Sequence, residues 1–320
     1  MPTSTAARAA SYTELAIGIF GLFGNVNILV AVARKKNLRS KCYLLIALIA
    51  LYDTIAIVFE YFQALVFIFE VVITTKQCFQ TIWLFFFTLN MQIVTVLSVA
   101  VDRLLAVAIP TRYRLISAKK WILLTLLPGV AVNAIFVPWA YFTTNDLPVN
   151  GCNPPSSIPD DVAFWWSKLT VAINVVVVVT YIAVIITIRF RARSFSTSSH
   201  DQQAKNFFLL QQKAMRTVSV IIVVICCTWF LTQAIAFLYY AFPELLDHPW
   251  FVASSELVVI PVISGYSANY YVYFWRNSEY RQVFKEQLAA ICPCLKQALQ
   301  SNKVLFSKTS STNNNGGSAL

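Results

Sequence analysis

The sequence predicts an all-α membrane protein, a bundle of seven transmembrane helices with a short amphipathic helix after the last span. Apolar residues make up 58% of the 320 positions and charged residues 12%, about half of the roughly 25% charged share of a soluble chain. So few charges argue against a soluble enzyme, whereas seven spans need only about 140 apolar positions. The expected spans are Leu15–Ala33, Leu44–Phe69, Phe79–Val101, Trp121–Phe142, Val162–Ile188, Thr217–Phe242 and Trp250–Phe274.

The first apolar segment is expected to remain in the protein as a helix. Its 19 residues exceed the roughly 7–15 apolar residues of a signal peptide, and the basic residues Arg34–Lys36 follow it instead of preceding it. We expect 1–14 to be an extracellular N-terminus and 15–275 to be the seven-transmembrane domain. Residues 276–296 should form an amphipathic cytoplasmic helix, and 297–320 a disordered cytoplasmic tail.

The positive charges gather in alternate connections. Of the 25 Lys and Arg residues, all except Arg8, Lys76 and Lys168 follow the first, third, fifth or seventh span. The positive-inside rule then puts the N-terminus outside and the C-terminus in the cytoplasm. Cationic loops beside an anionic inner leaflet explain the net charge of +11, so we expect no nucleic-acid partner. The opposite segments hold Glu14, Glu70, Asp146, Asp160, Asp161, Glu244 and Asp247.

Two of the seven cysteines, Cys78 and Cys152, fall in segments expected outside. An oxidising compartment favours a disulfide between them, and two free thiols are the alternative. After the last span, Phe274–Phe284 places aromatic and cationic residues at helical spacing, which suits a helix lying on the inner leaflet. There Cys292 and Cys294 are either lipid-modified or unmodified, and membrane lipid is an expected partner.

The most specific pattern lies at the end of the third span. Asp102 and Arg103 are followed by an Ala-Val pair, by Pro110 and by an Arg-Tyr pair that ends at Tyr113. This pattern resembles the Asp-Arg-Tyr region of rhodopsin-like G-protein-coupled receptors, and the 25-residue spacing from Cys78 to Arg103 fits that family's third helix. The resemblance implies an activation switch at Asp102 and Arg103, with Pro110 in the G-protein-coupling region. An isolated Asp-Arg pair would instead mark only the inner end of a helix.

Other positions keep the register of the same family. The resemblance implies a transmembrane polar core at Asn25, Asp53 and Trp229. An acid such as Asp53 is costly in a bilayer and is a functional candidate by default. The alternative is a protonated Asp that only hydrogen-bonds to neighbouring helices. The family often holds sodium at this Asp with a Ser, but Gln92 takes that position here, so the sequence leaves a sodium site open.

The resemblance also implies switch residues at Tyr181, Asn269 and Tyr273. Ile173 and Tyr270 stand where the family has Pro, and the Pro of the sixth span is missing as well. Because Pro kinks helices, we expect straighter helices than the family average. Within the family, the Pro-less sixth span and the Asn-Tyr ending of the seventh are most similar to the nematode serpentine chemoreceptors of class SX.

The ligand is expected to be an extracellular small molecule or short peptide, because only about 14 residues precede the first span. Amine receptors of the family carry an acid where this chain has Phe85, which disfavours a monoamine, and the seventh span lacks the Lys that retinal requires. The pocket candidates can equally be interhelical packing residues. They are Glu60, Phe85, Leu89, Trp229, Gln233 and Glu256.

Together these features predict a chemosensory receptor of the plasma membrane, with a sensory cilium as a fitting location, that activates a heterotrimeric G protein. It should need no cofactor, metal or catalytic residue. A neuropeptide receptor of the same fold is one alternative. A transporter is another, but transporters show internal repeats and helices broken by Gly or Pro, and this chain has 8 Gly and no repeat. An intramembrane enzyme is disfavoured because His200 and His248 fall in loops on opposite sides.

Overall fold

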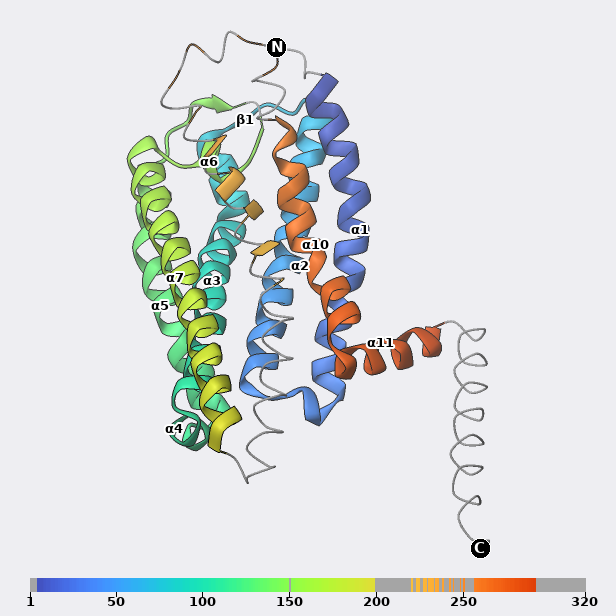
Figure 1. The fold of residues 1–320 in the computed structure, drawn as a ribbon. Helices are drawn as coiled ribbons and strands as arrows, with labels where there is room; N and C mark the ends of the chain where they lie inside the picture. Colours follow the sequence, from blue (N-terminus) through green and yellow to red (C-terminus); the bar gives the residue numbers. More distant parts are fainter. Residues whose placement is uncertain are drawn as a thin grey trace, which may run out of the picture. The chain divides into compact units, whose positions relative to one another are not determined.

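The computed structural model (Figure 1) describes residues 5–149, 151–198 and 256–291, and individual positions between 220 and 250. It contains two units, Met1–Val272 and Tyr273–Leu320, which are described separately. Most of the predicted sixth span lies outside the described residues. The same holds for the predicted site residues Trp229, Gln233, Cys292 and Cys294.

Five helices in the described part of the chain are long and apolar enough to cross a membrane. They correspond to the first five predicted spans, and α10 (Val259–Arg276) covers the second half of the predicted seventh. The described helices therefore agree with the predicted all-α membrane bundle. The five helices, seen in Figure 1 in colours from blue to yellow, are α1 (Thr5–Arg34), α2 (Lys41–Ile68), α3 (Thr75–Ala108), α5 (Ala118–Thr143) and α7 (Asp160–Ser198).

These helices extend beyond the apolar segments that predicted them. At the start of α3, Thr74 and Gln77 form a reciprocal capping box, with hydrogen bonds of 3.2 and 3.1 Å between side chain and backbone. Helix α1 begins at Thr5, ten residues before Leu15, because its Ala-rich start favours a helix without being strongly apolar. Glu14, which we expected in the outer segments, therefore lies inside α1 and is buried.

Short elements connect the long helices. A 3-10 turn η1 (Lys36–Leu38) follows α1, α4 (Pro110–Leu115) follows α3, and α6 (Pro154–Ser157) precedes α7. Strands β1 (Ile73–Thr74) and β2 (Pro148–Val149) pair antiparallel, a ladder that the sequence did not predict. The predicted disulfide is confirmed, because Cys78 in α3 is bonded to Cys152 in the connection after β2. We call this end of the bundle the disulfide end, and the opposite end of α3, at Arg103, the arginine end.

Helix α3 is the most buried of these five helices. In the apolar stretch of each helix that could cross a membrane, 78% of the residues are buried in α3, against 28% in α5 and 22% in α7. The outer surfaces of α5 and α7 expose large apolar side chains such as Leu123, Leu127 and Val179. Exposed apolar surface on this scale is stable when lipid covers it. Because most of α3 is buried, by contrast, its polar residues face protein on nearly every side.

Glycines let α1 approach its neighbours closely. A side chain on Gly24 would place its Cβ 2.6 Å from the Cβ of Tyr270 in α10, so only glycine fits there. Tyr270 is the residue that stands where the resembling family has Pro. In this chain the position is used for helix packing, because the ring lies against the gap that Gly24 leaves.

The second unit holds the end of α10 and α11 (Ser278–Ile291). Asn277 starts α11, since its side-chain oxygen accepts from the backbone N–H of Glu279 at 2.9 Å and of Tyr280 at 3.2 Å. The Arg281 guanidinium donates to the backbone oxygen of Phe274 at 2.8 Å, which satisfies a carbonyl at the end of α10. A helix thus forms within the predicted range 276–296, and its place on a membrane surface stays a prediction.

Candidate functional site

The predicted switch residues form a buried ion pair at the arginine end. The Arg103 guanidinium contacts Oδ2 of Asp102 at 2.5 Å through Nη2 and at 3.1 Å through Nε. Both side chains are buried, so the charges are removed from solvent together. A buried pair of this kind is costly to break, because either charge alone would lack a counter-ion. Asp102 therefore holds the Arg103 guanidinium in place.

Tyr113 occupies the other oxygen of the same carboxylate. Its hydroxyl donates to Oδ1 of Asp102 at 2.6 Å. Tyr113 lies on α4, which Pro110 starts at its first helical position, where a missing backbone N–H costs nothing. Burial, followed by the neighbouring Asp102 charge, raises the pKa of Tyr113 well above its ordinary value, so the phenol keeps its proton and remains a donor.

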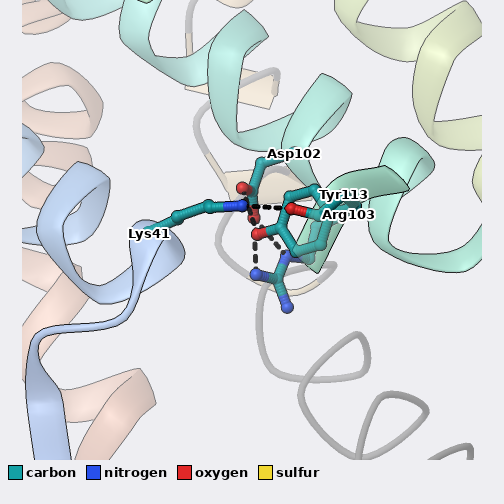
Figure 2. A network of polar contacts seen from close by, with 4 residues as sticks. All are labelled: Lys41, Asp102, Arg103 and Tyr113. Atoms are coloured by element: carbon teal, nitrogen blue, oxygen red, sulfur yellow. Dashed lines mark hydrogen bonds and ion pairs between the residues drawn. The ribbon is translucent and has the colours of Figure 1, made fainter. Parts of the chain in front are cut away.

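Lys41, at the start of α2, completes a network of four side chains (Figure 2). Its ammonium group donates to the backbone oxygen of Tyr113 and lies 3.8 Å from the centre of the Tyr113 ring. The cation thus contacts the tyrosine through both a hydrogen bond and a cation–π interaction. Lys41 thereby attaches α4 to α2 and keeps Tyr113 within reach of Asp102.

A further contact joins α7 to this region. The Arg191 guanidinium donates to the backbone oxygen of Ala108, the last residue of α3, at 2.7 Å. Tyr181, a predicted switch residue, is buried on the same helix. Its role in activation stays a prediction. Tyr273 belongs to the second unit, where its ring centre lies 4.9 Å from that of Tyr280, so its role also stays a prediction.

Asp53 is the centre of a second polar cluster, in the middle of α2. Its Oδ1 accepts a hydrogen bond from the Gln92 amide of α3 at 2.6 Å, and its Oδ2 accepts one from the Asn269 amide of α10 at 2.5 Å. All three side chains are buried. Two of the predicted residues, Asp53 and Asn269, are thus brought together. Asn25 of α1 contacts the same region of α10 by donating to the backbone oxygen of Tyr266 at 3.0 Å.

Each carboxylate oxygen of Asp53 accepts one hydrogen bond, from the amide of Gln92 or of Asn269. The other end of the Gln92 amide, its Oε1, is buried without a hydrogen-bond partner. Gln92, in place of the family's Ser, therefore joins α2 to α3 by a direct hydrogen bond to Asp53.

The predicted pocket residues Phe85 and Leu89 lie on α3 toward the disulfide end. Both belong to a buried cluster with the bonded Cys78 and Cys152. Phe85 stacks on Phe59 of α2 with ring centres 5.8 Å apart and planes inclined by 5°. At the position where amine receptors carry an acid, this chain therefore has a fully packed aromatic ring.

Glu60, another predicted pocket residue, faces α1. Its side chain is 6% exposed and neighbours that of Glu14, which is 2% exposed. Glu256 precedes α10 and is partly exposed. The structure thus places Phe85 and Leu89 in one cluster and Glu60 in a different one, while Trp229 and Gln233 lie outside the described residues.

Sequence reasoning missed three residues of these clusters. In the sequence, Tyr113 marks only the end of a motif, and Lys41 is one of the basic residues after the first span. Glu14 precedes the first apolar segment, which places it among the acids expected outside. The sequence does contain a signal that Glu14 belongs to the first helix. Gly18 and Gly21 follow it by one and two helical turns, so all three residues share one face of a longer helix.

Comparison with protein-family models gives a match. A family model described as "Serpentine type 7TM GPCR chemoreceptor Srsx" matches residues 18–288. The match runs from the middle of α1 into α11 and covers 271 of the 320 residues, so it includes both polar clusters. Together with the described helices, it confirms the predicted all-α seven-transmembrane fold. No curated protein matches the chain.

Proposed function

The chain belongs to the serpentine 7TM GPCR chemoreceptor Srsx family, and on this premise we propose that it binds an extracellular small molecule or short peptide and activates a heterotrimeric G protein. The observation that supports this most directly is the Asp102–Arg103 pair at 2.5 Å. It is a two-state element, because Arg103 can pair with Asp102 or turn toward a partner protein. Membership of the family makes the chain a receptor and a multi-pass membrane protein.

In the resting state, Tyr113 and Lys41 hold Asp102 against Arg103. When ligand binding shifts the helices, loss of the Tyr113 hydrogen bond leaves the carboxylate with one partner instead of two. The Arg103 guanidinium is then released more easily and supplies cationic N–H donors to the G protein. The energy of the step comes from the ligand's stronger binding to the active arrangement.

The proposal includes an orientation in the plasma membrane, with a sensory cilium as the expected site. The arginine end faces the cytoplasm, since the connections near it carry most of the Lys and Arg residues. The disulfide end then faces outside, as an oxidised cysteine pair requires. Residues 276–296 lie along the inner leaflet as an amphipathic helix, where Cys292 and Cys294 are candidates for lipid attachment.

A ligand-independent experiment tests the function. We expect Asp102→Asn to raise basal nucleotide exchange on a panel of purified G-protein heterotrimers about 5-fold, the effect of about 1 kcal/mol on a two-state equilibrium. Arg103→Ala added to this variant should return exchange to background. Failure of Asp102→Asn to activate any G-protein class, with the receptor folded, would contradict the proposal. Solute uptake by the same protein would then favour a transporter.

A further inference from the structure

An exposed lysine lies against two aromatic rings near the start of α7. The Nζ atom of Lys168 is 3.8 Å from the ring centre of Phe164 and 5.4 Å from that of Trp165. The two rings meet edge to face, with centres 5.6 Å apart and planes inclined by 84°. Because helical side chains lean toward the helix N-terminus, the ammonium group of Lys168 reaches back one turn, toward the disulfide end.

This cluster presents a cation and apolar surface together. Within the described part of the chain, the ammonium group of Lys168 contacts the two rings and makes no hydrogen bond or ion pair. Phe164 and Trp165 are 53% and 55% exposed, so most of each ring is open to whatever surrounds the protein. A partner for such a surface has to be both apolar and anionic.

The position of the cluster along α7 matches the edge of a bilayer. Twenty uncharged residues, 169–188, separate Lys168 from Arg189. At about 1.5 Å per residue they span about 30 Å, the thickness of the hydrocarbon core. Helix α7 is 39 residues long, so it extends beyond this core at both ends. Lys168 then lies where the phosphate groups of one leaflet begin.

The exposed face of α7 supports this placement. Large apolar side chains continue from Lys168 at helical spacing along one face, and Arg189 and the exposed Phe190 end this stripe at the other side of the core. A cation beside an aromatic ring therefore marks both ends of a surface that lipid chains can cover. The apolar residues of the stripe are Val175, Val179, Ile182 and Ile186.

Helix α5, which packs beside α7, gives the same thickness independently. Twenty uncharged residues, 121–140, follow the exposed Lys120 and lead to the exposed rings of Tyr141 and Phe142. These ring centres lie 5.4 Å apart. Because α5 ends toward the disulfide end, where α7 begins, the aromatic pairs of the two helices lie at the same edge of the bilayer.

We propose that Lys168, Phe164 and Trp165 bind the phosphodiester group of a phospholipid in the leaflet at the disulfide end. The ammonium group of Lys168 donates to the phosphate oxygens. The two rings lie against the glycerol esters, and the stripe that continues along α7 contacts the acyl chains. The inference goes beyond the proposed function, since this site needs neither the receptor's ligand nor a G protein.

A phospholipid fits this surface better than a free anion or a second protein chain. A free phosphate ion would pair with Lys168 but would leave the Phe164 and Trp165 rings in water. A symmetric dimer through the same stripe would bring two Lys168 side chains to the same depth, where like charges repel. A phospholipid supplies the anion and the apolar chains in one molecule, in the order in which α7 presents their partners.

The test identifies what lies beside the cluster. A photoreactive benzoylphenylalanine replaces Asp161, an exposed residue one helical turn before Phe164 and Trp165. The purified full-length receptor in an uncharged detergent is irradiated with phosphatidylglycerol below saturation, and adducts are measured by mass spectrometry. The yield of the lipid adduct is expected to fall about 5-fold in Lys168→Gln. Lys76→Gln removes an exposed cation at the same end and should keep the full yield.

Two comparisons in the receptor with Lys168 intact separate the lipid from other sources of the signal. Diacylglycerol with the same chains lacks the phosphate and should give less adduct, and an excess of inorganic phosphate over chloride at equal ionic strength should not displace phosphatidylglycerol. Equal adducts from both lipids, or equal yields with and without Lys168, would overturn the proposal. Displacement by inorganic phosphate, or adducts to a second receptor in place of lipid, would also overturn it. Since no ligand or G protein is present, these outcomes leave the proposed function standing.

Discussion

The hydroxyl of Tyr113 donates to Oδ1 of Asp102 at 2.6 Å, from a short helix that begins at Pro110. Because Arg103 occupies Oδ2, the carboxylate has a separate partner on each oxygen. The Tyr113 side chain is neutral, so its loss from Asp102 leaves no unpaired charge. Breaking this hydrogen bond therefore costs little free energy compared with breaking the ion pair. Under the proposed function, α4 would regulate the switch without contacting the ligand.

Tyr113→Phe removes this hydrogen bond and keeps the ring over Lys41. A net loss of about 1 kcal/mol is expected, enough to raise basal G-protein activation about 5-fold. The measurement is ligand-independent nucleotide exchange at equal receptor density. Tyr141→Phe, at an exposed tyrosine on α5, serves as the control and should leave exchange unchanged. Unaltered exchange in Tyr113→Phe would show that the bond does not hold the resting state.

Arg103→Ala removes the group that the proposed function presents to the G protein. We expect agonist-stimulated activation to be abolished while surface expression remains, because the lost side chain lies at the end of α3 and outside the apolar cluster. Surface labelling and G-protein activation should be measured on the same cells. Arg112→Ala, at an exposed cation on α4, should signal normally. Intact signalling by Arg103→Ala would show that Arg103 is not the activation switch.

Asn269→Ala leaves Oδ2 of Asp53 without its donor. Loss of a hydrogen bond to a buried acceptor is expected to lower the free energy of unfolding by about 1–3 kcal/mol, detected as a lower unfolding midpoint. The matched control is Ser264→Ala, since Ser264 donates only to the Ile260 backbone oxygen of its own helix. An unfolding midpoint of Asn269→Ala equal to that of the wild type would show that this hydrogen bond contributes nothing to stability.

Cys78→Ser opens the disulfide, which joins two residues 74 positions apart in the sequence. Loss of a structural disulfide typically costs about 2–4 kcal/mol, so we expect less receptor at the surface and a lower unfolding midpoint. Cys152→Ser should have the same effect on surface expression and on the unfolding midpoint. The double variant should be little less stable than either single variant, because one disulfide is lost in each case. Cys227→Ser, at an exposed free cysteine, is the control. A stable, normally expressed Cys78→Ser receptor would deny the bridge a structural role.

The sequence predicted the elements better than the contacts between them. Five spans and the Cys78–Cys152 pairing were confirmed, because apolar length and compartment are properties of each segment. The position of Glu14 was wrong, since a helix continues wherever backbone hydrogen bonds persist and does not stop where hydropathy falls. The roles of the predicted switch residues remain predictions, with only the Asp102–Arg103 and Asp53–Asn269 contacts now described.

By itself, the sequence determined the class of protein, its expected orientation and the polar residues that a bilayer makes costly, since each depends on residues close together in the chain. Only the tertiary structure decided which of these residues meet. Gln92 and Asp53 are 39 positions apart, and Asp53 and Asn269 are 216 apart. Such pairings depend on how closely and in what rotation helices pack, and the glycines of α1 bring it close to Tyr61 of α2 and to Ser267 and Tyr270 of α10.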